Sequence, residues 1–355
     1  MDEREVDFSA LPIELLRSIV EARNDVVRFR SVYASCRSSS PPPCEILPSL
    51  PLPLPSPTRS ARRAYVSHRT FYHFKLPDDV NPNPSTCSSK SWLVKVEEFE
   101  FGQKCLLNPL PNLHFGFPFP KGINLLDYQV VEVSKEYKLQ SISGMPIVGV
   151  NKLVLFPDSA WNSCVEDTLI FALYDDRKLG YVKYGDENWT LLDDLDFGYD
   201  DIIVYKGKPY VIDDLGMVSW IDSSMKQIKF LSPLFGLGDR KHLVESRGEL
   251  YVVDRYFEYR DCPKTIAFEV FELDQEWDFW VKVKNLGDQV FILSKDSSVS
   301  VSATDFSGCK GNCIYFIYED DNGVFNRKTG KIVNFQDQCP LFSLPPILAP
   351  LKIFI

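Results

Sequence analysis

The chain has 355 residues, of which 45% are hydrophobic and 25% charged, and its formal net charge is −10 at pH 7. These are ordinary globular proportions, so most of the chain can bury a core, and its length suits two or three domains. The acidic balance argues against nucleic acid and anionic membrane as partners, because both select a basic protein surface.

The N-terminus and the cysteines indicate an intracellular protein. The acidic start of the chain lacks a basic stretch followed by an apolar core, so we expect no secretory signal. No apolar run approaches the roughly 18 residues that span a bilayer. The nine cysteines are an odd number scattered along the chain, which suits reduced thiols better than a disulfide framework. We therefore expect a cytoplasmic and/or nuclear protein.

Residues 8–40 are predicted to form a short all-α segment of two helices. Pro12 suits the first turn of a helix, where its missing N–H has no partner to lose. Each helix has an apolar stripe, formed by Leu11, Leu15, Leu16, Ile19 and Val20 in the first and by Val26, Phe29, Val32, Tyr33 and Cys36 in the second. Two helices this short cannot bury a core alone. The stripes therefore need either the rest of the chain or a partner to cover them.

Residues 41–61 are predicted to be a proline-rich linker. Eight prolines stand between positions 41 and 57, a density that forbids helix and sheet and favours extended polyproline II. Three interpretations remain open: a semi-rigid spacer between two binding ends, a disordered loop, and a ligand for proline-recognition domains.

From residue 62 to residue 355 the hydrophobic period changes to two, which predicts β-strands separated by tight turns. Gly and Asp at the turns supply the backbone angles that hairpins need. The clearest predicted hairpins pair residues 168–174 with 179–184, 201–205 with 209–212, and 241–245 with 249–253. Helix signals are nearly absent from this part of the chain.

A weak internal repeat indicates the arrangement of these strands. Tyr210 and Tyr251 occupy equivalent positions in two Gly-x-x-Tyr-Val-(Ile/Val)-Asp segments and lie 41 residues apart. That spacing is typical of a four-stranded propeller blade, whose repeats run about 40–50 residues. The sequence therefore predicts a mainly β body with roughly six blades.

The sequence lacks the motifs of catalysis. GxSxG, HExxH, Walker and GxGxxG patterns are all missing, and His68 and His73 are spaced for neither face of a helix nor a strand. Acidic pairs at 193–194, 200–201, 213–214 and 320–321 are read either as carboxylates of a propeller hydrolase or as turn residues that cap hairpins. Their places between predicted strands favour turns. We expect no catalytic residue, no metal and no cofactor.

Short motifs along almost the whole chain resemble a known family. Residues 11–16 (LPIELL), 28–32 (RFRSV) and 35–39 (SCRSS) resemble a plant F-box. The rest is similar to the kelch-like C-terminal domain that accompanies the F-box in a large plant-specific family. The matching stretches are residues 92–98, 106–110, 189–192, 199–203, 243–246, 286–288 and 311–316.

The resemblance implies a kelch-like β-propeller at residues 62–355 that holds an unidentified protein substrate. F-box proteins present such substrates to a cullin–RING ligase through a Skp-type adaptor. The implied adaptor-binding residues are Leu11, Pro12, Leu15, Leu16, Ile19, Phe29 and Val32. The expected function is therefore the non-catalytic substrate-recognition subunit of a Skp–cullin–F-box ubiquitin ligase.

Three positions depart from the family pattern and keep an alternative open. The family usually has Trp where Phe8 stands, Cys where Tyr33 stands and Trp where Cys36 stands, and the segment between Ile19 and Phe29 is about three residues short. Loss of a large aromatic residue at a docking face removes buried area. The alternative is a protein-binding or regulatory protein whose degenerate F-box binds no adaptor.

Overall fold

The structure is a computed structural model that describes residues 64–76, 91–98, 104–109, 114–118, 128–141, 147, 149–157, 168–175, 177–183, 185–192, 198–229, 238–259, 262–274, 276, 279–306, 308–318 and 321–334. The predicted helical segment, the predicted linker and the seven predicted adaptor-binding residues lie outside this part of the chain. Across the described ranges, no helix is long and apolar enough to cross a membrane.

The first sheet has nine strands in the order β4-β3-β2-β1-β5-β6-β7-β8-β9. Its strands are β1 (Ala64–Lys75), β2 (Ser91–Glu98), β3 (Lys104–Leu107), β4 (His114–Pro118), β5 (Gln129–Ser141), β6 (Val150–Phe156), β7 (Leu169–Tyr174), β8 (Lys178–Lys183) and β9 (Thr190–Leu191). β5 and β6 are joined at a single residue pair, Tyr137 with Leu153. The sheet therefore divides into two units, β1–β5 and β6–β9.

Three further sheets complete the described fold, in the orders β10-β11-β12-β13, β14-β15-β16-β17 and β19-β18-β20-β21-β22. The strands are β10 (Tyr199–Tyr205), β11 (Lys208–Asp213), β12 (Val218–Ile221), β13 (Gln227–Lys229), β14 (Arg240–Ser246), β15 (Glu249–Glu258), β16 (Lys264–Asp274), β17 (Phe279–Lys282), β18 (Gln289–Ser294), β19 (Ser298–Ser302), β20 (Cys313–Tyr318), β21 (Asp321–Asn326) and β22 (Lys331–Val333). β18 and β20 run parallel, and a single 3-10 turn, η5 (Ala303–Asp305), follows β19.

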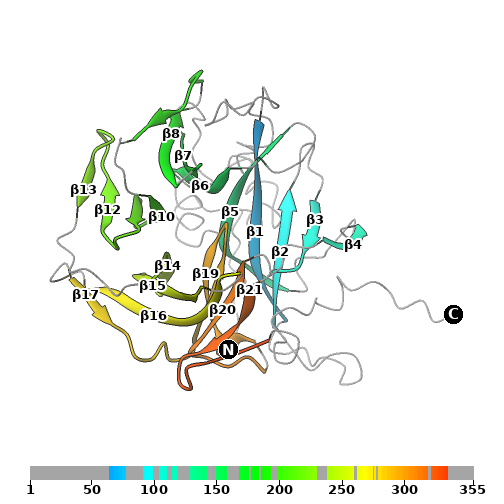
Figure 1. Ribbon diagram of the computed structural model, residues 1–355. Coiled ribbons are helices and arrows are strands. Elements are labelled where there is room, and N and C mark those ends of the chain that lie inside the picture. The colour runs from blue at the N-terminus through cyan, green and yellow to red at the C-terminus, as the bar shows by residue number, and fades with distance from the viewer. Residues whose placement is uncertain are drawn as a thin grey trace, which may run out of the picture.

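The sheets stand around a central space that is bordered by β5, β6, β10, β14 and β19 (Figure 1). Each pair of neighbouring units shares a hydrophobic cluster, as expected when sheets pack face to face. One cluster joins β6–β9 to the second sheet, another joins the second sheet to the third, and a further one joins the third sheet to the fourth. Two more join β1–β5 to β6–β9 and to the fourth sheet. The five units therefore close into a ring, which is the arrangement of a β-propeller.

The three predicted hairpins are confirmed, because β7 pairs with β8, β10 with β11 and β14 with β15. Tyr210 and Tyr251 lie on β11 and β15, the second strands of consecutive sheets, as the repeat predicts. The expectation of roughly six blades is one more than the five units that the described strands form. The repeat length fails in the first unit, where β1 and β5 are 12 and 13 residues long and use more chain.

The acidic pair Asp200–Asp201 does not cap a turn, which corrects its interpretation as turn residues, whereas the predicted strand that begins at residue 201 is confirmed. Both lie within β10 and are buried. The Asp201 carboxylate accepts the backbone N–H of Leu243 at 2.8 Å and the Lys152 ammonium at 2.6 Å. It therefore fastens β10 to β14 on one side and to β6 on the other. Asp200 accepts the N–H of Lys241 at 2.9 Å in the same way.

The other acidic pairs divide between the two roles. Asp213 behaves as predicted, since its carboxylate accepts the N–H of Met217 across the turn at 2.7 Å. Asp321 instead begins β21 and accepts the Thr265 N–H at 2.9 Å and the Arg255 guanidinium at 2.8 Å, so it joins the fourth sheet to the third. Positions 193, 194 and 320 lie outside the described residues.

Replacing the carboxylate of Asp201 tests whether it holds neighbouring blades together. We expect Asp201→Ala to lower the free energy of unfolding by about 3 kcal/mol, because it leaves a buried ammonium and a buried N–H without their partner. The control is Asp222→Ala. Asp222 accepts the N–H groups of Ser224 and Lys226 in an exposed turn at 2.9 Å, and we expect its loss to change the free energy of unfolding much less than the loss of Asp201. Urea unfolding measures both, and equal losses would contradict the role of Asp201.

Candidate functional site

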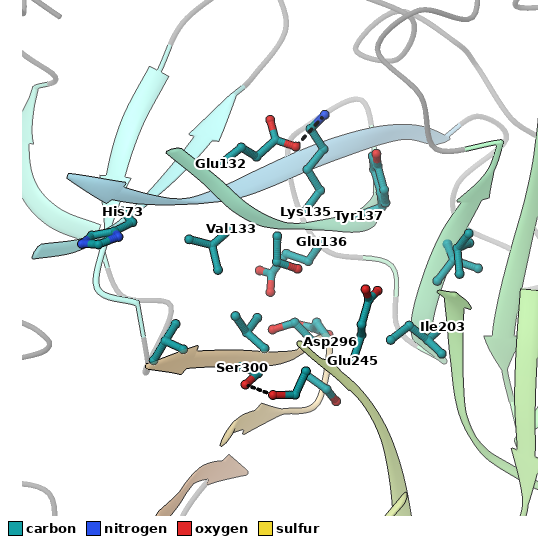
Figure 2. A pocket seen from close by; sticks show the side chains of 18 of the residues that line it. His73, Glu132, Val133, Lys135, Glu136, Tyr137, Ile203, Glu245, Asp296 and Ser300 are labelled. Atoms are coloured by element: carbon teal, nitrogen blue, oxygen red, sulfur yellow. Dashed lines mark hydrogen bonds and ion pairs between the residues drawn. The ribbon is translucent and has the colours of Figure 1, made fainter. Parts of the chain in front are cut away.

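A cavity of about 610 Å³ lies at the centre of the ring, and every inner strand contributes to its wall (Figure 2). The wall comprises parts of β5, β6, β10, β14 and β19, with His73 of β1 and Phe306 after η5 at one side. A volume of this size falls within the range of ligand-binding pockets in proteins.

Serine hydroxyls form one side of the cavity because β19 alternates strictly. Ser298, Ser300 and Ser302 lie on one face of the strand, and Val299 and Val301 lie on the other, in the hydrophobic cluster shared with the first sheet; residues of both faces border the cavity. This is the period-two pattern of a strand with one polar and one buried face. The inner surface of the fourth sheet therefore offers a row of hydroxyl groups.

A hydrogen-bond network joins these serines to the end of β14. The Ser246 and Ser300 hydroxyls lie 2.8 Å apart. The Gln289 amide satisfies its neighbours when its nitrogen donates to Ser246 and Ser300, at 3.2 and 3.0 Å, and its oxygen accepts from Arg247 at 2.9 and 3.0 Å. The network fixes the side chains where the third and fourth sheets meet the cavity.

The charged groups of the wall have an acidic excess. Its acidic members are Glu132, Glu136, Glu245, Asp296 and Asp305, and its basic members are Lys135, Lys152 and Arg247. All three basic groups are engaged in ion pairs. Lys135 binds Glu132 at 3.1 Å, Lys152 binds Asp201 at 2.6 Å, and Arg247 pairs with Asp288.

Glu136 belongs to a buried charge cluster that also contains Lys95, Arg69 and Glu97. Lys95 and Arg69 both pair with Glu136, Arg69 at 3.5 Å, and Arg69 also binds Glu97 at 2.7 Å. Burial alone would raise the pKa of Glu136, but the charges of Lys95 and Arg69 outweigh it and lower the pKa to about 2. Burial lowers the pKa of Lys95 to about 8, against the attraction of Glu136. The cluster therefore ties β5 to β1 and β2 through charges.

Two acidic groups of the wall, Glu245 and Asp305, form no ion pair with a described residue. Loss of surrounding water raises the pKa of Glu245, and the charge of Lys206 opposes that shift. His73 stacks on Phe306 with ring centroids 4.9 Å apart, and burial lowers its pKa. These groups are held by the fold but keep hydrogen-bonding capacity toward the cavity.

The cavity presents hydroxyls, an amide and carboxylates on a rigid frame of strands, and such groups can bind a polar ligand. In the part of the chain that the structure describes, no three His, Cys, Asp or Glu side chains gather as a metal site requires. The described cysteines Cys262, Cys309 and Cys313 carry thiols rather than disulfides.

Sequence reasoning did not identify the cavity residues. The alternating serines at 298–302 were a local signal that one face of a strand is polar, but nothing local told that face from an ordinary solvated one. The seven predicted adaptor-binding residues lie outside the described ranges, so the structure does not test whether they form one surface.

Comparison with known proteins finds one family that matches most of the chain. The profile of the KIB1-4 beta-propeller family matches residues 60–332. Among curated proteins of Arabidopsis thaliana, F-box protein SKIP23 is 30% identical over 96% of this chain and 95% of its own length. F-box protein At2g26160 is 28% identical over 91% of this chain and 98% of its own, and F-box protein At4g35733 is 28% identical over 96% and 98%.

A solved structure from Bacteroides thetaiotaomicron, titled a structural genomics protein of unknown function, covers 68% of this chain and 64% of its own. Its TM-score is 0.31 and its identity 12%. A likeness this distant adds nothing to the assignment.

The buried cluster predicts a specific pH dependence of stability. Because the pKa of Glu136 is lowered on folding, the unfolded chain binds more protons than the folded one between about pH 4.5 and 2. The stability that ionised Glu136 contributes is therefore present above this window and is lost as the pH falls through it. We expect Glu136→Gln to be about 3 kcal/mol less stable than the wild type at pH 7, because two buried cations lose their partner.

The difference in the free energy of unfolding between the wild type and Glu136→Gln should become smaller as the pH is lowered through that window. Urea unfolding at pH 7 and pH 3 measures this difference. Glu187→Gln, at an exposed turn position, serves as the control and should track the wild type at both values. A gap of the same size at both pH values would contradict the ionised cluster.

Proposed function

Because the chain belongs to the family of plant F-box proteins that carry a KIB1-4 β-propeller, we propose that it is the substrate-recognition subunit of a Skp–cullin–F-box ubiquitin ligase. The observation that carries this proposal is the similarity to an F-box protein over 96% of the chain, together with the propeller match over residues 60–332. In this role the N-terminal segment docks on a Skp-type adaptor, and through it on a cullin–RING ligase, in the cytoplasm and/or the nucleus. The propeller holds the protein substrate, and the chain itself catalyses nothing.

The proposed docking face is the pair of apolar stripes near the N-terminus. It comprises Leu11, Pro12, Leu15, Leu16, Ile19, Phe29 and Val32. Two short helices cannot bury such stripes by themselves, so a partner that covers them gains the free energy of removing apolar surface from water. Buried aliphatic and aromatic anchors of this kind carry most of the energy of a protein interface.

The propeller supplies the second binding end. Its sheets form a closed ring whose cavity carries polar and charged groups on inner strands, and a rigid frame of this kind loses little conformational entropy when a partner binds. Propellers of unrelated function share the architecture, so specificity resides in the side chains of the cavity and of the loops around it.

A regulatory or protein-binding role without a ligase is the second candidate. It is favoured by Phe8, Tyr33 and Cys36, which replace residues usual in the family, and by the short segment between the two predicted helices. In that case the propeller binds its partner and the N-terminal segment recruits no adaptor.

Co-purification of the full chain with a Skp-type adaptor tests the ligase role. We expect wild type to recover the adaptor and Leu15→Asp to recover at least about tenfold less, because a charge replaces an apolar anchor at the centre of the docking face. The matched control is Leu54→Asp in the predicted linker, which should recover as much adaptor as the wild type.

Equal recovery by wild type and Leu15→Asp would mean that the docking face lies elsewhere. A folded wild-type chain that recovers no adaptor would overturn the ligase role and support the regulatory alternative.

A further inference from the structure

We propose that the central cavity binds a basic side chain, lysine or arginine, of the protein that the propeller recognises. This inference rests on the proposed function, because it names the chemical class of target that the propeller selects. It depends on three observations: the unequal pairing of charges on the cavity wall, the hydrogen-bonding groups on the wall of the same cavity, and the apolar surface beside the unpaired acid.

The charges of the wall favour a cationic ligand. Five acidic and three basic side chains line the cavity, and each of the three basic groups already has an acidic partner. An anionic ligand would have to displace one of those ion pairs. A cation can instead pair with Glu245, whose carboxylate points into the cavity from β14 and makes no ion pair with a described residue (Figure 2).

The position of Glu245 also makes a cation favourable energetically. Glu245 is the one exposed residue of β14, so its carboxylate is open to a ligand, and partial loss of surrounding water raises its pKa. A cationic group that takes the place of that water restores the stabilisation through a charge-assisted hydrogen bond. Glu136 faces the same space from β5, but its charge is already paired with Lys95 and Arg69, which leaves Glu245 as the group that a cation can engage (Figure 2).

Hydroxyl groups on the wall of the same cavity can accept further hydrogen bonds from an ammonium or guanidinium group. Ser298 Oγ is buried and has no hydrogen-bond partner among the described residues. Ser300 lies on the same face of β19 and is hydrogen-bonded to Ser246, which points to the opposite side of β14 from Glu245. An ammonium carries three donors and a guanidinium five, so a carboxylate together with hydroxyls suits both.

Apolar side chains beside the carboxylate fit the stem of a basic residue. Ile203 of β10 lies next to Glu245, and Val133 of β5 lines the same cavity (Figure 2). Lysine and arginine place a long aliphatic stem against apolar surface while the charged head reaches a polar partner. A small inorganic cation would use the carboxylate but would leave this apolar surface without a role.

Binding of short peptides by the full chain tests the inference. The probes are glycine–serine peptides with capped ends and one central lysine, arginine or acetyl-lysine, titrated by ligand-observed NMR. We expect the lysine and arginine peptides to bind at least about tenfold more tightly than the acetyl-lysine peptide, because acetylation removes the charge and keeps the stem. The relative Kd of the lysine and arginine peptides tells which basic residue the cavity prefers.

Two matched variants distinguish the cavity from general attraction to an acidic protein. Glu245→Gln should raise the Kd of the lysine peptide about tenfold. Glu276→Gln changes the net charge equally at an exposed turn position and should change the Kd less than twofold. Equal effects of the two variants, equal binding of lysine and acetyl-lysine peptides, or no binding of any peptide would overturn the inference.

Adaptor recovery in the same preparation separates this inference from the proposed function. If adaptor binding persists while the peptides fail to discriminate, the inference is wrong and the ligase role stands. If the lysine peptide binds as expected but no adaptor is recovered, the cavity keeps its role in a protein outside the ligase.

Discussion

The ring of a propeller is closed where its first and last blades meet, and side-chain contacts must close it there because the backbone does not run from one of these blades directly to the other. In this chain that junction is made by the cluster in which Phe71 and Leu93 of the first sheet pack against Val290, Val299 and neighbouring apolar residues of the fourth. Beside it, Lys138 of β5 binds Asp296 at 2.5 Å. Apolar packing closes the ring. The ion pair fixes how the first and fourth sheets are aligned, because a shift of either strand would separate the two charges.

The cavity is a consequence of that closure. β5 and β19 come together at the junction, and each contributes charged or hydroxyl side chains to the wall beside apolar side chains of the shared cluster. The aspartates of β10 hold the opposite part of the ring through β6 and β14. Strands fixed in this manner keep polar groups in place before a ligand binds, which reduces the conformational entropy lost on binding. The fold thus accounts for a rigid recognition end, whatever the F-box-like end recruits.

Features set by neighbouring residues could be predicted, and features set by distant ones could not. The hairpins around Lys206 and Arg247 were found because turn chemistry and alternating hydrophobicity are local. The role of Asp201 was not predicted, because its partner Leu243 lies 42 residues away. In the sequence, a pair of aspartates that caps a turn cannot be told from a pair that joins two blades. Ser246 and Ser300 are 54 residues apart, so the cavity exists only once the sheets are assembled. The adaptor-binding face, including Leu15, stays a prediction.

Hydrogen–deuterium exchange of the full-length Phe71→Ala protein tests most directly whether the ring is closed at this junction. Removal of a buried aromatic ring from the shared cluster weakens everything that packs on it, by about 3–5 kcal/mol at a well-packed site. The closed ring predicts faster amide exchange in β18 and β19 of the fourth sheet as well as in β1 and β2, with β11 and β12 of the second sheet unchanged. Faster exchange confined to the first sheet would contradict the closed ring and the cavity that depends on it.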